Sequence, residues 1–198
     1  MRDEWVGTSK TDPIQVDFLP DDEVGMPGRL GMTFAPGMWA GSVGGRWERD
    51  LATDLRALEE KYETDVLVSL MEKHEYHGYQ IPELLEQDNV GNIEILRFAI
   101  KDMGVPQEAE SERFETFVQD VVQRLEQGQT VVVHCRGGLG RTGTLATCVL
   151  VALGHHSADE AIAAVREARK GTVQTREQED FVRIFEGMIR TRRHEQRN

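Results

Sequence analysis

The stretch HCRGGLGRTG, residues 134–143, decides the fold expected of this chain. It follows the apolar run TVVV at residues 130–133, which predicts a buried strand, and from Arg141 onward the sequence has a helical pattern. A tight glycine-rich turn between a strand and a helix aims several backbone N–H groups at one centre, and the helix N-terminus adds positive potential. These residues therefore predict a loop that binds a phosphate dianion.

Two side chains of this loop carry the expected chemistry. Cys135 stands at the end of the strand, where the positive field of the loop favours its thiolate form. Arg141 can donate two parallel charge-assisted hydrogen bonds to a phosphate. Attack of the thiolate on phosphorus would form a phosphocysteine, which water then hydrolyses. A small buried cysteine at a strand end is the alternative interpretation of Cys135, and the glycines and arginine that follow it argue against that alternative.

The other residues of the loop have supporting roles. The expected phosphate-binding set is Arg136, Gly137, Gly138, Leu139, Gly140 and Arg141. We expect Thr142 to donate a hydrogen bond to the departing thiolate and His134 to hold the loop from beneath. Ordinary packing or capping explains Thr142 and His134 equally well, so both alternatives stay open.

A cysteine, five residues and an arginine form the signature of the cysteine-dependent protein phosphatases, and the chain resembles that superfamily, in its dual-specificity type. Residues 79–85 (YQIPELL), 102–106 (DMGVP) and 171–175 (GTVQT) are similar, in order and spacing, to the kinase-associated phosphatase family. The resemblance covers about residues 30–188. It implies a phosphoprotein substrate, with a kinase as the family's partner, and chemistry without cofactor or metal. No matched residue is a kinase-docking residue.

Asp102 is the candidate general acid. Expulsion of an alkoxide or phenolate needs a proton donor, and Asp102 follows the strand-like residues 93–100 and begins a loop with Gly104 and Pro106. The resembling family has its acid at this position. The alternative is a turn aspartate that bonds its own backbone.

Gln178 is the candidate for positioning the hydrolytic water in the second step. It stands early in the last helix, three residues after Thr175, a plausible N-cap. A capping-box glutamine needs no catalytic role, so that alternative stays open, and Gln174 is a possible substitute.

Composition agrees with one enzyme domain. The 198 residues suffice for a substantial core. A net charge of −12 argues against a nucleic-acid partner, and the short apolar runs predict no membrane span. The loop has no lysine, unlike typical phosphoinositide phosphatases of this superfamily, which favours a phosphoprotein over a lipid. One of the two cysteines is the expected nucleophile, so a reducing compartment, by default the cytoplasm, is expected. A monomer is the default oligomeric state.

The order of the expected elements predicts an α/β fold, with a central, mostly parallel sheet flanked by helices. Strands are expected at residues 30–34, 65–70, 93–100 and 130–133, and helices at residues 47–62, 82–87, 111–127, 141–153, 158–170 and 175–192. Ligands of such sheets bind at the carboxyl ends of the strands, which is where Cys135 falls.

The expected domain spans residues 30–192. Residues 1–29 are expected to be a partly flexible extension, in which residues 14–18 suit an edge strand, and residues 193–198 a basic tail. Residues 72–79 are expected to form a rim loop at the substrate entrance. Cys148 is expected in the core rather than in a disulfide with Cys135.

Three alternatives to a protein phosphatase remain at this stage. One is a phosphate-recognising module without turnover, against which the combination of Cys135, Arg141 and Asp102 speaks. Another is a phosphatase for a non-protein phosphate ester. The third is sulfur or arsenate redox chemistry, which needs a resolving cysteine, and only Cys148 is available.

Overall fold

A six-stranded sheet forms the centre of the computed structural model, which describes residues 5–42 and 45–197. Its strands are β2 (Asp17–Phe18), β3 (Arg29–Thr33), β6 (Val66–Ser69), β7 (Asn89–Val90), β8 (Ile93–Arg97) and β9 (Thr130–His134). Their spatial order is β2-β3-β9-β6-β8-β7. The four inner strands run parallel, and the edge strands β2 and β7 run antiparallel to their neighbours. The predicted α/β fold with a mostly parallel sheet is confirmed.

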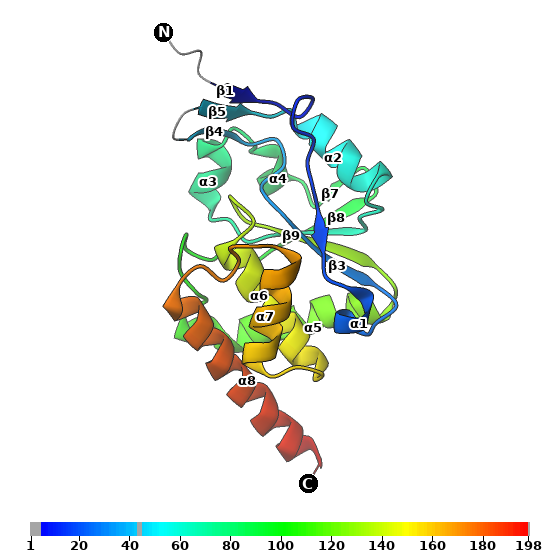
Figure 1. Ribbon diagram of the computed structural model, residues 1–198, viewed down its shortest axis with the longest axis vertical. Helices are drawn as coiled ribbons and strands as arrows, with labels where there is room; N and C mark the ends of the chain where they lie inside the picture. Colours follow the sequence, from blue (N-terminus) through cyan, green and yellow to red (C-terminus); the bar gives the residue numbers. More distant parts are fainter. Residues whose placement is uncertain (1–4, 43–44, 198) are drawn as a thin grey trace.

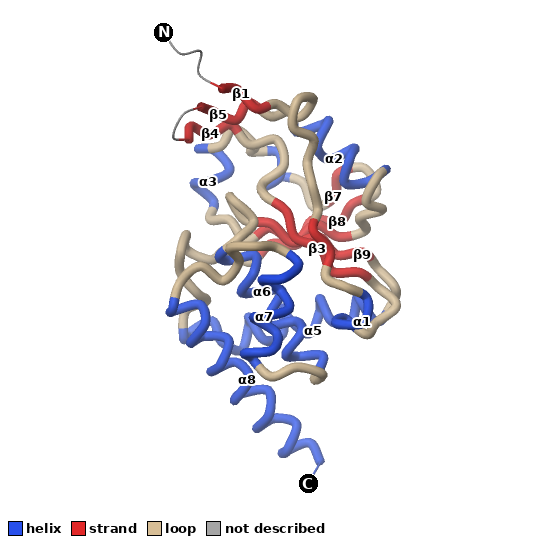
Figure 2. The backbone as a smooth tube through the Cα atoms, viewed as in Figure 1, coloured by secondary structure: helices blue, strands red, loops and turns tan. Residues whose placement is uncertain are grey.

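Helices cover both faces of this sheet (Figure 1). On one face lie α1 (Asp21–Val24), α5 (Ser111–Glu126), α6 (Gly140–Leu153), α7 (Ala158–Ala168) and α8 (Arg176–Arg197). On the other lie α2 (Leu51–Glu60), α3 (Lys73–Gly78) and α4 (Glu83–Glu86). A short 3₁₀ turn, η1 (Glu108–Glu110), precedes α5. Figure 2 shows the strands as a layer between these two groups of helices.

The central strand β9 is buried on both faces, which explains its unbroken apolar sequence. Val131 and Val133 belong to the core under α5 to α8, whereas Val132 belongs to the core under α2 to α4. Successive side chains of a strand point to opposite faces, so an apolar run is required wherever helices cover both.

A second, smaller sheet explains why the helix expected at residues 47–62 is wrong at its start. It consists of β1 (Trp5–Gly7), β4 (Trp39–Ser42) and β5 (Gly45–Glu48), in the order β1-β5-β4. Trp47 pairs with Ala40 in this sheet. The helix α2 begins only after Asp50, whose carboxylate accepts a hydrogen bond from the backbone N–H of Thr53 (2.7 Å).

The segment ahead of β3 packs into the same cores as the rest of the chain. Ile14 and Leu19 are 1% and 2% exposed, and Val24 is also buried. The edge strand expected within residues 14–18 is present as β2. The boundary expected at residue 30 therefore does not separate this segment from the folded unit, and residues 1–4 lie outside the described part. At the other end, α8 continues to Arg197 without a break at residue 193.

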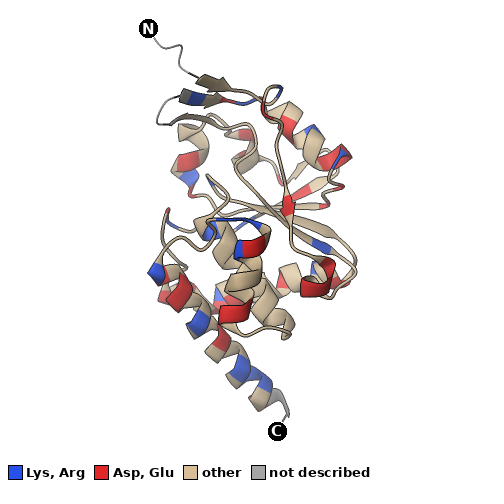
Figure 3. Ribbon diagram, in the orientation of Figure 1, with Lys and Arg blue, Asp and Glu red and all other residues tan. Residues whose placement is uncertain are grey.

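Charged residues of both signs lie along α8 (Figure 3). Several form ion pairs one turn apart, such as Arg183 with Asp180 (3.0 Å). Within the described ranges, no helix combines the length and the apolar character that crossing a membrane requires.

Candidate active site

The segments that follow two of the parallel strands converge on one cavity. β9 leads directly to Cys135, and the chain reaches Asp102 five residues after β8 ends. Both residues line a cavity of about 260 Å³, at the edge of the sheet where ligands of such folds bind. The lining residues are Asp102, Met103, Cys135, Arg136, Gly137, Leu139, Gly140, Arg141 and Gln174. The structure thus brings the expected nucleophile, acid and most of the expected loop together.

The shape of the loop requires a glycine at one position and leaves little room for a side chain at another. Gly138 has a φ of +68°, and a Cβ there would meet the carbonyl oxygen of Thr33 at 2.1 Å. A Cβ on Gly140 would meet the side-chain amides of Gln174 and Gln178, each at 2.9 Å. The backbone contact excludes a side chain at Gly138, whereas a side chain at Gly140 would require the ends of Gln174 and Gln178 to shift.

Arg169, on the segment after α7, fixes the loop from outside the cavity. Its Nε donates to the carbonyl of Gly138 (2.8 Å) and its Nη2 to the carbonyl of Gly137 (3.2 Å). Its Nη1 is paired with Asp17 of β2. In a trans peptide the N–H points opposite to the C=O, so the amides that follow these two carbonyls point away from Arg169. Arg169 thereby orients the N–H groups of Gly138 and Leu139.

His134 lies beneath the loop, as expected. Its side chain is fully buried, and its Nδ1 lies 3.1 Å from the carbonyl oxygen of Cys135. Burial lowers the pKa of His134 to about 4, so the ring is neutral at pH 7 and its Nδ1–H donates to this carbonyl. Thr142 is buried, and its Oγ1 has no hydrogen-bond partner among the described residues. Its role toward the thiolate stays a prediction.

Arg141 is held by a carboxylate that the sequence analysis missed. Its Nη1 and Nη2 donate to the two carboxylate oxygens of Glu75, at 2.6 and 2.9 Å. The carbonyl of Ile100 also accepts from Nη1 (3.0 Å). Burial acts to lower the pKa of Arg141, but its hydrogen bonds to Glu75 and the nearby negative charges raise it overall. Likewise, burial acts to raise the pKa of Glu75, and Arg141 lowers it overall. The pair is ionised in the folded protein.

Asp102 makes two contacts, one in its own turn and one with the phosphate-binding arginine. Its Oδ1 accepts a hydrogen bond from the backbone N–H of Met103 (3.1 Å), which is the turn contact. The same oxygen lies 2.9 Å from Nη2 of Arg141, across the cavity that contains Cys135. Its side chain is 52% exposed. Asp102 therefore sits in the turn and also faces the phosphate-binding arginine.

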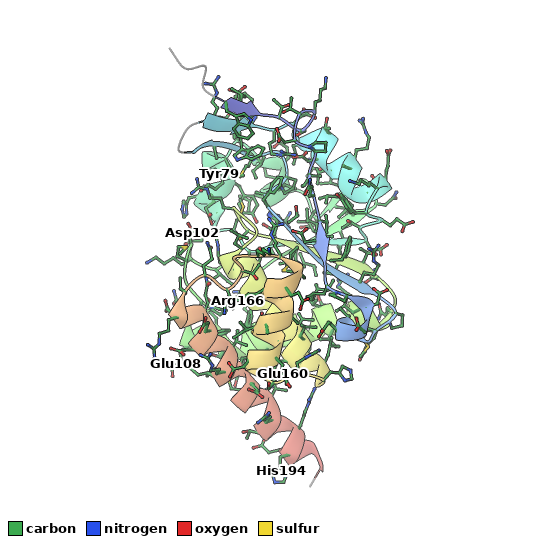
Figure 4. All side chains as sticks on the ribbon, in the orientation of Figure 1. Tyr79, Asp102, Glu108, Glu160, Arg166 and His194 are labelled. Carbon is green, nitrogen blue, oxygen red and sulfur yellow. The ribbon has the colours of Figure 1, made fainter. Side chains whose placement is uncertain are left out.

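The structure agrees with the capping alternative for Gln178 and places another amide in the lining of the cavity. Gln178 is fully buried; its Oε1 accepts from the backbone N–H of Gln174 (2.8 Å) and its Nε2 donates to the carbonyl of Gly104 (3.2 Å). The oxygen and the nitrogen of its amide thus bond to the backbone of two different loops. Gln174 is exposed and lines the cavity. Arg166, labelled on α7 in Figure 4, donates to the carbonyl of Val173 (2.7 Å) and so fixes the loop that carries Gln174.

The expected rim loop at residues 72–79 is instead the helix α3, and this is why Glu75 was missed. Glu72 and Glu75 form a capping box at its start. The helix directs the Glu75 carboxylate inward to Arg141, while Tyr79 follows its last turn. The available signal was an acidic residue soon after β6, a strand whose carboxyl end lies beside that of β9. Cys148 is fully buried in the core, as expected.

Known proteins are similar to this chain in sequence. Cyclin-dependent kinase inhibitor 3 of Rattus norvegicus is 28% identical over 185 residues, which cover 92% of this chain and 84% of the relative. Protein tyrosine phosphatase domain-containing protein 1 of Danio rerio is 38% identical over 108 residues, 52% of this chain and 14% of that protein.

Solved structures agree on the fold. A kinase associated phosphatase with its catalytic-site cysteine substituted by serine matches with a TM-score of 0.79 and 24% identity, over 90% of this chain and 97% of that one. Tk-PTP in its active form matches with a TM-score of 0.61 and 25% identity, over 87% and 96%. A family model described as PTP-SAK, Swiss Army Knife protein, DSP-PTPase phosphatase domain, matches residues 47–182. The chain therefore belongs to this family of cysteine-dependent, dual-specificity phosphatases.

Proposed function

We propose that this phosphatase removes phosphate from proteins through a phosphocysteine on Cys135, with Asp102 as the general acid. One arrangement carries the proposal: Cys135 and Asp102 line the same cavity as Arg141, whose Nη2 has Asp102 as a neighbour at 2.9 Å. A nucleophile, a proton donor and a phosphate-binding cation are the parts that such a reaction needs.

The first step transfers the phosphoryl group to sulfur. The substrate phosphate takes Nε and Nη2 of Arg141 and displaces Asp102, since Nε is buried without a partner among the described residues. Asp102 is the proton donor that this step requires. As the thiolate of Cys135 forms the S–P bond, the P–O bond breaks and Asp102 protonates the leaving oxygen.

The second step returns the enzyme to its starting state. A water molecule attacks phosphorus, the S–P bond breaks, and the Asp102 carboxylate takes a proton from the water. Gln174 lines the cavity and is our candidate for positioning this water. Thr142 donates its hydroxyl proton in a hydrogen bond to the departing sulfur. Inorganic phosphate then leaves.

A phosphorylated kinase is the candidate partner that the relatives suggest. Their names, cyclin-dependent kinase inhibitor 3 and kinase associated phosphatase, point to it. The net charge of −12 and the absence of lysine between Cys135 and Arg141 favour a protein over a highly anionic lipid. We keep the cytoplasm as the proposed location, because the Cys135 thiolate needs a reducing compartment.

Hydrolysis of an aryl phosphate and of a phosphopeptide in the presence of a metal chelator tests the proposal. Turnover that Cys135→Ser abolishes is expected. Phosphopeptide binding without turnover would instead indicate a recognition module, and activity only on phosphate esters of small molecules would remove proteins as the substrate. Capture of a phosphorylated kinase by Cys135→Ser, and its release by inorganic phosphate, tests the partner.

A further inference from the structure

Arg136 is a pocket-lining cation that no described side chain neutralises. It is exposed and borders the cavity next to Cys135. No ion pair or hydrogen bond joins its guanidinium to any residue within the described ranges. Its recorded partner is the ring of Tyr79, whose centroid lies 5.3 Å from the guanidinium carbon. Arg141, by contrast, is already bonded to Glu75.

Both members of this stacked pair have fixed backbones. Tyr79 ends α3: its N–H donates to the carbonyl of Glu75 (2.8 Å), and its own carbonyl accepts from the N–H of Trp39 (3.0 Å). The carbonyl of Arg136 accepts from the N–H of Ala35 (3.0 Å). A guanidinium stacked on an aromatic face keeps its N–H edge free to bind a ligand. Tyr79 therefore presents that edge at the mouth of the cavity.

Tyr79 and Asp102 lie on the same edge of the molecule, one above the other (Figure 4). Burial raises the pKa of Tyr79, so its phenol is neutral at pH 7. The pair of Tyr79 and Arg136 thus carries a net positive charge, and its guanidinium borders the cavity that contains Cys135.

We propose that Arg136, held by Tyr79, binds a second anionic group of the substrate, a carboxylate or phosphate on a residue adjacent to the phosphorylated residue. This inference rests on the proposed function. It predicts that the enzyme prefers phosphopeptides in which the residue next to the phosphorylated one is acidic. The net charge of the protein is −12, but an unpaired guanidinium gives this position a local positive charge, which attracts an anion. A peptide fits better than a membrane, because the overall charge repels an anionic bilayer.

The test compares three phosphopeptides that differ only in the residue next to the phosphorylated one, which is Glu, Gln or Lys. Each neighbour is placed once before and once after that residue. The wild type should hydrolyse the best Glu peptide with a kcat/KM about three- to tenfold above its Gln counterpart at low salt, as expected for a partly exposed charge-assisted contact. The Lys peptide should be poorer still, and added salt should narrow the differences.

Substitutions assign the preference to the stack. In Arg136→Gln the ratio of kcat/KM for the Glu and Gln peptides should fall to about one, which is the loss of that contact. Tyr79→Phe keeps an aromatic face and should keep the ratio, whereas Tyr79→Leu should reduce it. Arg56→Gln, on the exposed face of α2, removes the same charge elsewhere and should keep the ratio.

Several outcomes would overturn the inference. Equal rates for the three peptides in the wild type, or a preference that survives in Arg136→Gln, would show that Arg136 does not recognise the residue next to the phosphorylated one. Faster hydrolysis of a phosphatidylinositol bisphosphate in vesicles, lost in Arg136→Gln, would identify a lipid headgroup instead. If the wild type hydrolyses the Gln peptide without favouring Glu, only this inference fails. If it hydrolyses neither peptides nor an aryl phosphate, the proposed function fails as well.

Discussion

Oδ1 of Asp102 lies 2.9 Å from Nη2 of Arg141, so the proposed acid contacts the proposed phosphate-binding group. Glu75 holds the same nitrogen at 2.9 Å. The Asp102 carboxylate therefore occupies a position on Arg141 that a phosphate oxygen would take. Substrate binding has to exchange one anion for another on Arg141, and we expect the displaced Asp102 to protonate the leaving oxygen.

Asp102→Asn should have two separable effects. Hydrolysis of an alkyl phosphate, a poor leaving group, should slow about 100-fold or more, whereas hydrolysis of an aryl phosphate with a good leaving group should slow about tenfold or less. Inorganic phosphate should inhibit the variant more strongly, because a competing carboxylate is gone. Steady-state kinetics with a series of leaving groups measure the first effect, and the inhibition constant measures the second. Equal slowing for all leaving groups would remove Asp102 from the acid role.

Glu75→Gln should destabilise the protein and weaken phosphate binding together. Arg141 is 1% exposed, so loss of its carboxylate partner leaves a buried charge without compensation, at a cost of about 3 kcal/mol in the free energy of unfolding. Urea unfolding measures the stability, and KM measures how well Arg141 is oriented to bind the substrate phosphate. The matched control is Glu94→Gln, which breaks a more exposed pair with Arg124 and should cost about 1 kcal/mol or less. Similar losses for both variants would contradict the burial of the Glu75 pair.

The phosphate loop could be predicted from sequence because its parts are adjacent along the chain. The strand, Cys135, the glycines and Arg141 follow one another within a dozen residues. Glu75 could not be predicted in this way, since its partner Arg141 stands 66 positions away and only the parallel pairing of β6 with β9 brings them together.

Competition between local patterns explains the other errors. The leucines of α2 have helical spacing, which predicted a helix from Trp47 onward. Trp47 instead lies in β5, which pairs with β4, and the helix begins only after its cap, Asp50. For Gln174 and Gln178 the sequence offers two amides four residues apart, and only their packing shows which one lines the cavity.

Asp17→Asn should lower kcat although Asp17 lies far outside the loop. Asp17 is paired with Arg169, which holds the carbonyls of Gly137 and Gly138. Without this ion pair Arg169 holds the two carbonyls less firmly, and the loop amides can turn away from the phosphate. We therefore expect kcat to fall about tenfold, which is less than the fall in kcat when a whole oxyanion donor is removed. Arg169→Lys, which cannot make all three contacts, should lose more.

The control for this pair is Asp159→Asn, which breaks an exposed pair with Arg183 and should leave kcat unchanged. kcat/KM reports transition-state stabilisation and the inhibition constant for inorganic phosphate reports binding of the anion, both measured at a temperature where circular dichroism shows each variant to be folded. Unchanged kcat in Asp17→Asn would mean that Arg169 holds the loop without its carboxylate partner.

Gln174→Ala should slow the second step, and Gln178→Ala should mainly reduce stability. Gln174 lines the cavity, so its loss leaves the attacking water without its amide, and phosphocysteine should accumulate. Rapid mixing with an aryl phosphate should then show a burst of phenol release. Gln178 bonds to the backbone of two loops, and its loss should lower the free energy of unfolding by about 1–3 kcal/mol. A burst in Gln178→Ala alone would restore the role that the sequence suggested for it.

His134 should make stability depend on pH in a defined window. Its pKa falls from the usual 6.5 to about 4 in the folded protein, because burial disfavours the charged ring. Between these values the unfolded chain binds more protons than the folded one, so the free energy of unfolding rises with pH. The stabilisation is fully present above about pH 6.5 and is lost as the pH falls toward about 4, a change of about 3 kcal/mol.

Urea unfolding of the wild type and of His134→Gln, from pH 7 to pH 4.5, tests this dependence. The variant is expected to be less stable at pH 7, because the bond to the Cys135 carbonyl changes, but its stability should vary much less with pH. His194→Gln, at an exposed position on α8, should keep the wild-type slope. Parallel curves for the wild type and His134→Gln would mean that His134 binds protons equally in the folded and unfolded states, and burial would then not lower its pKa.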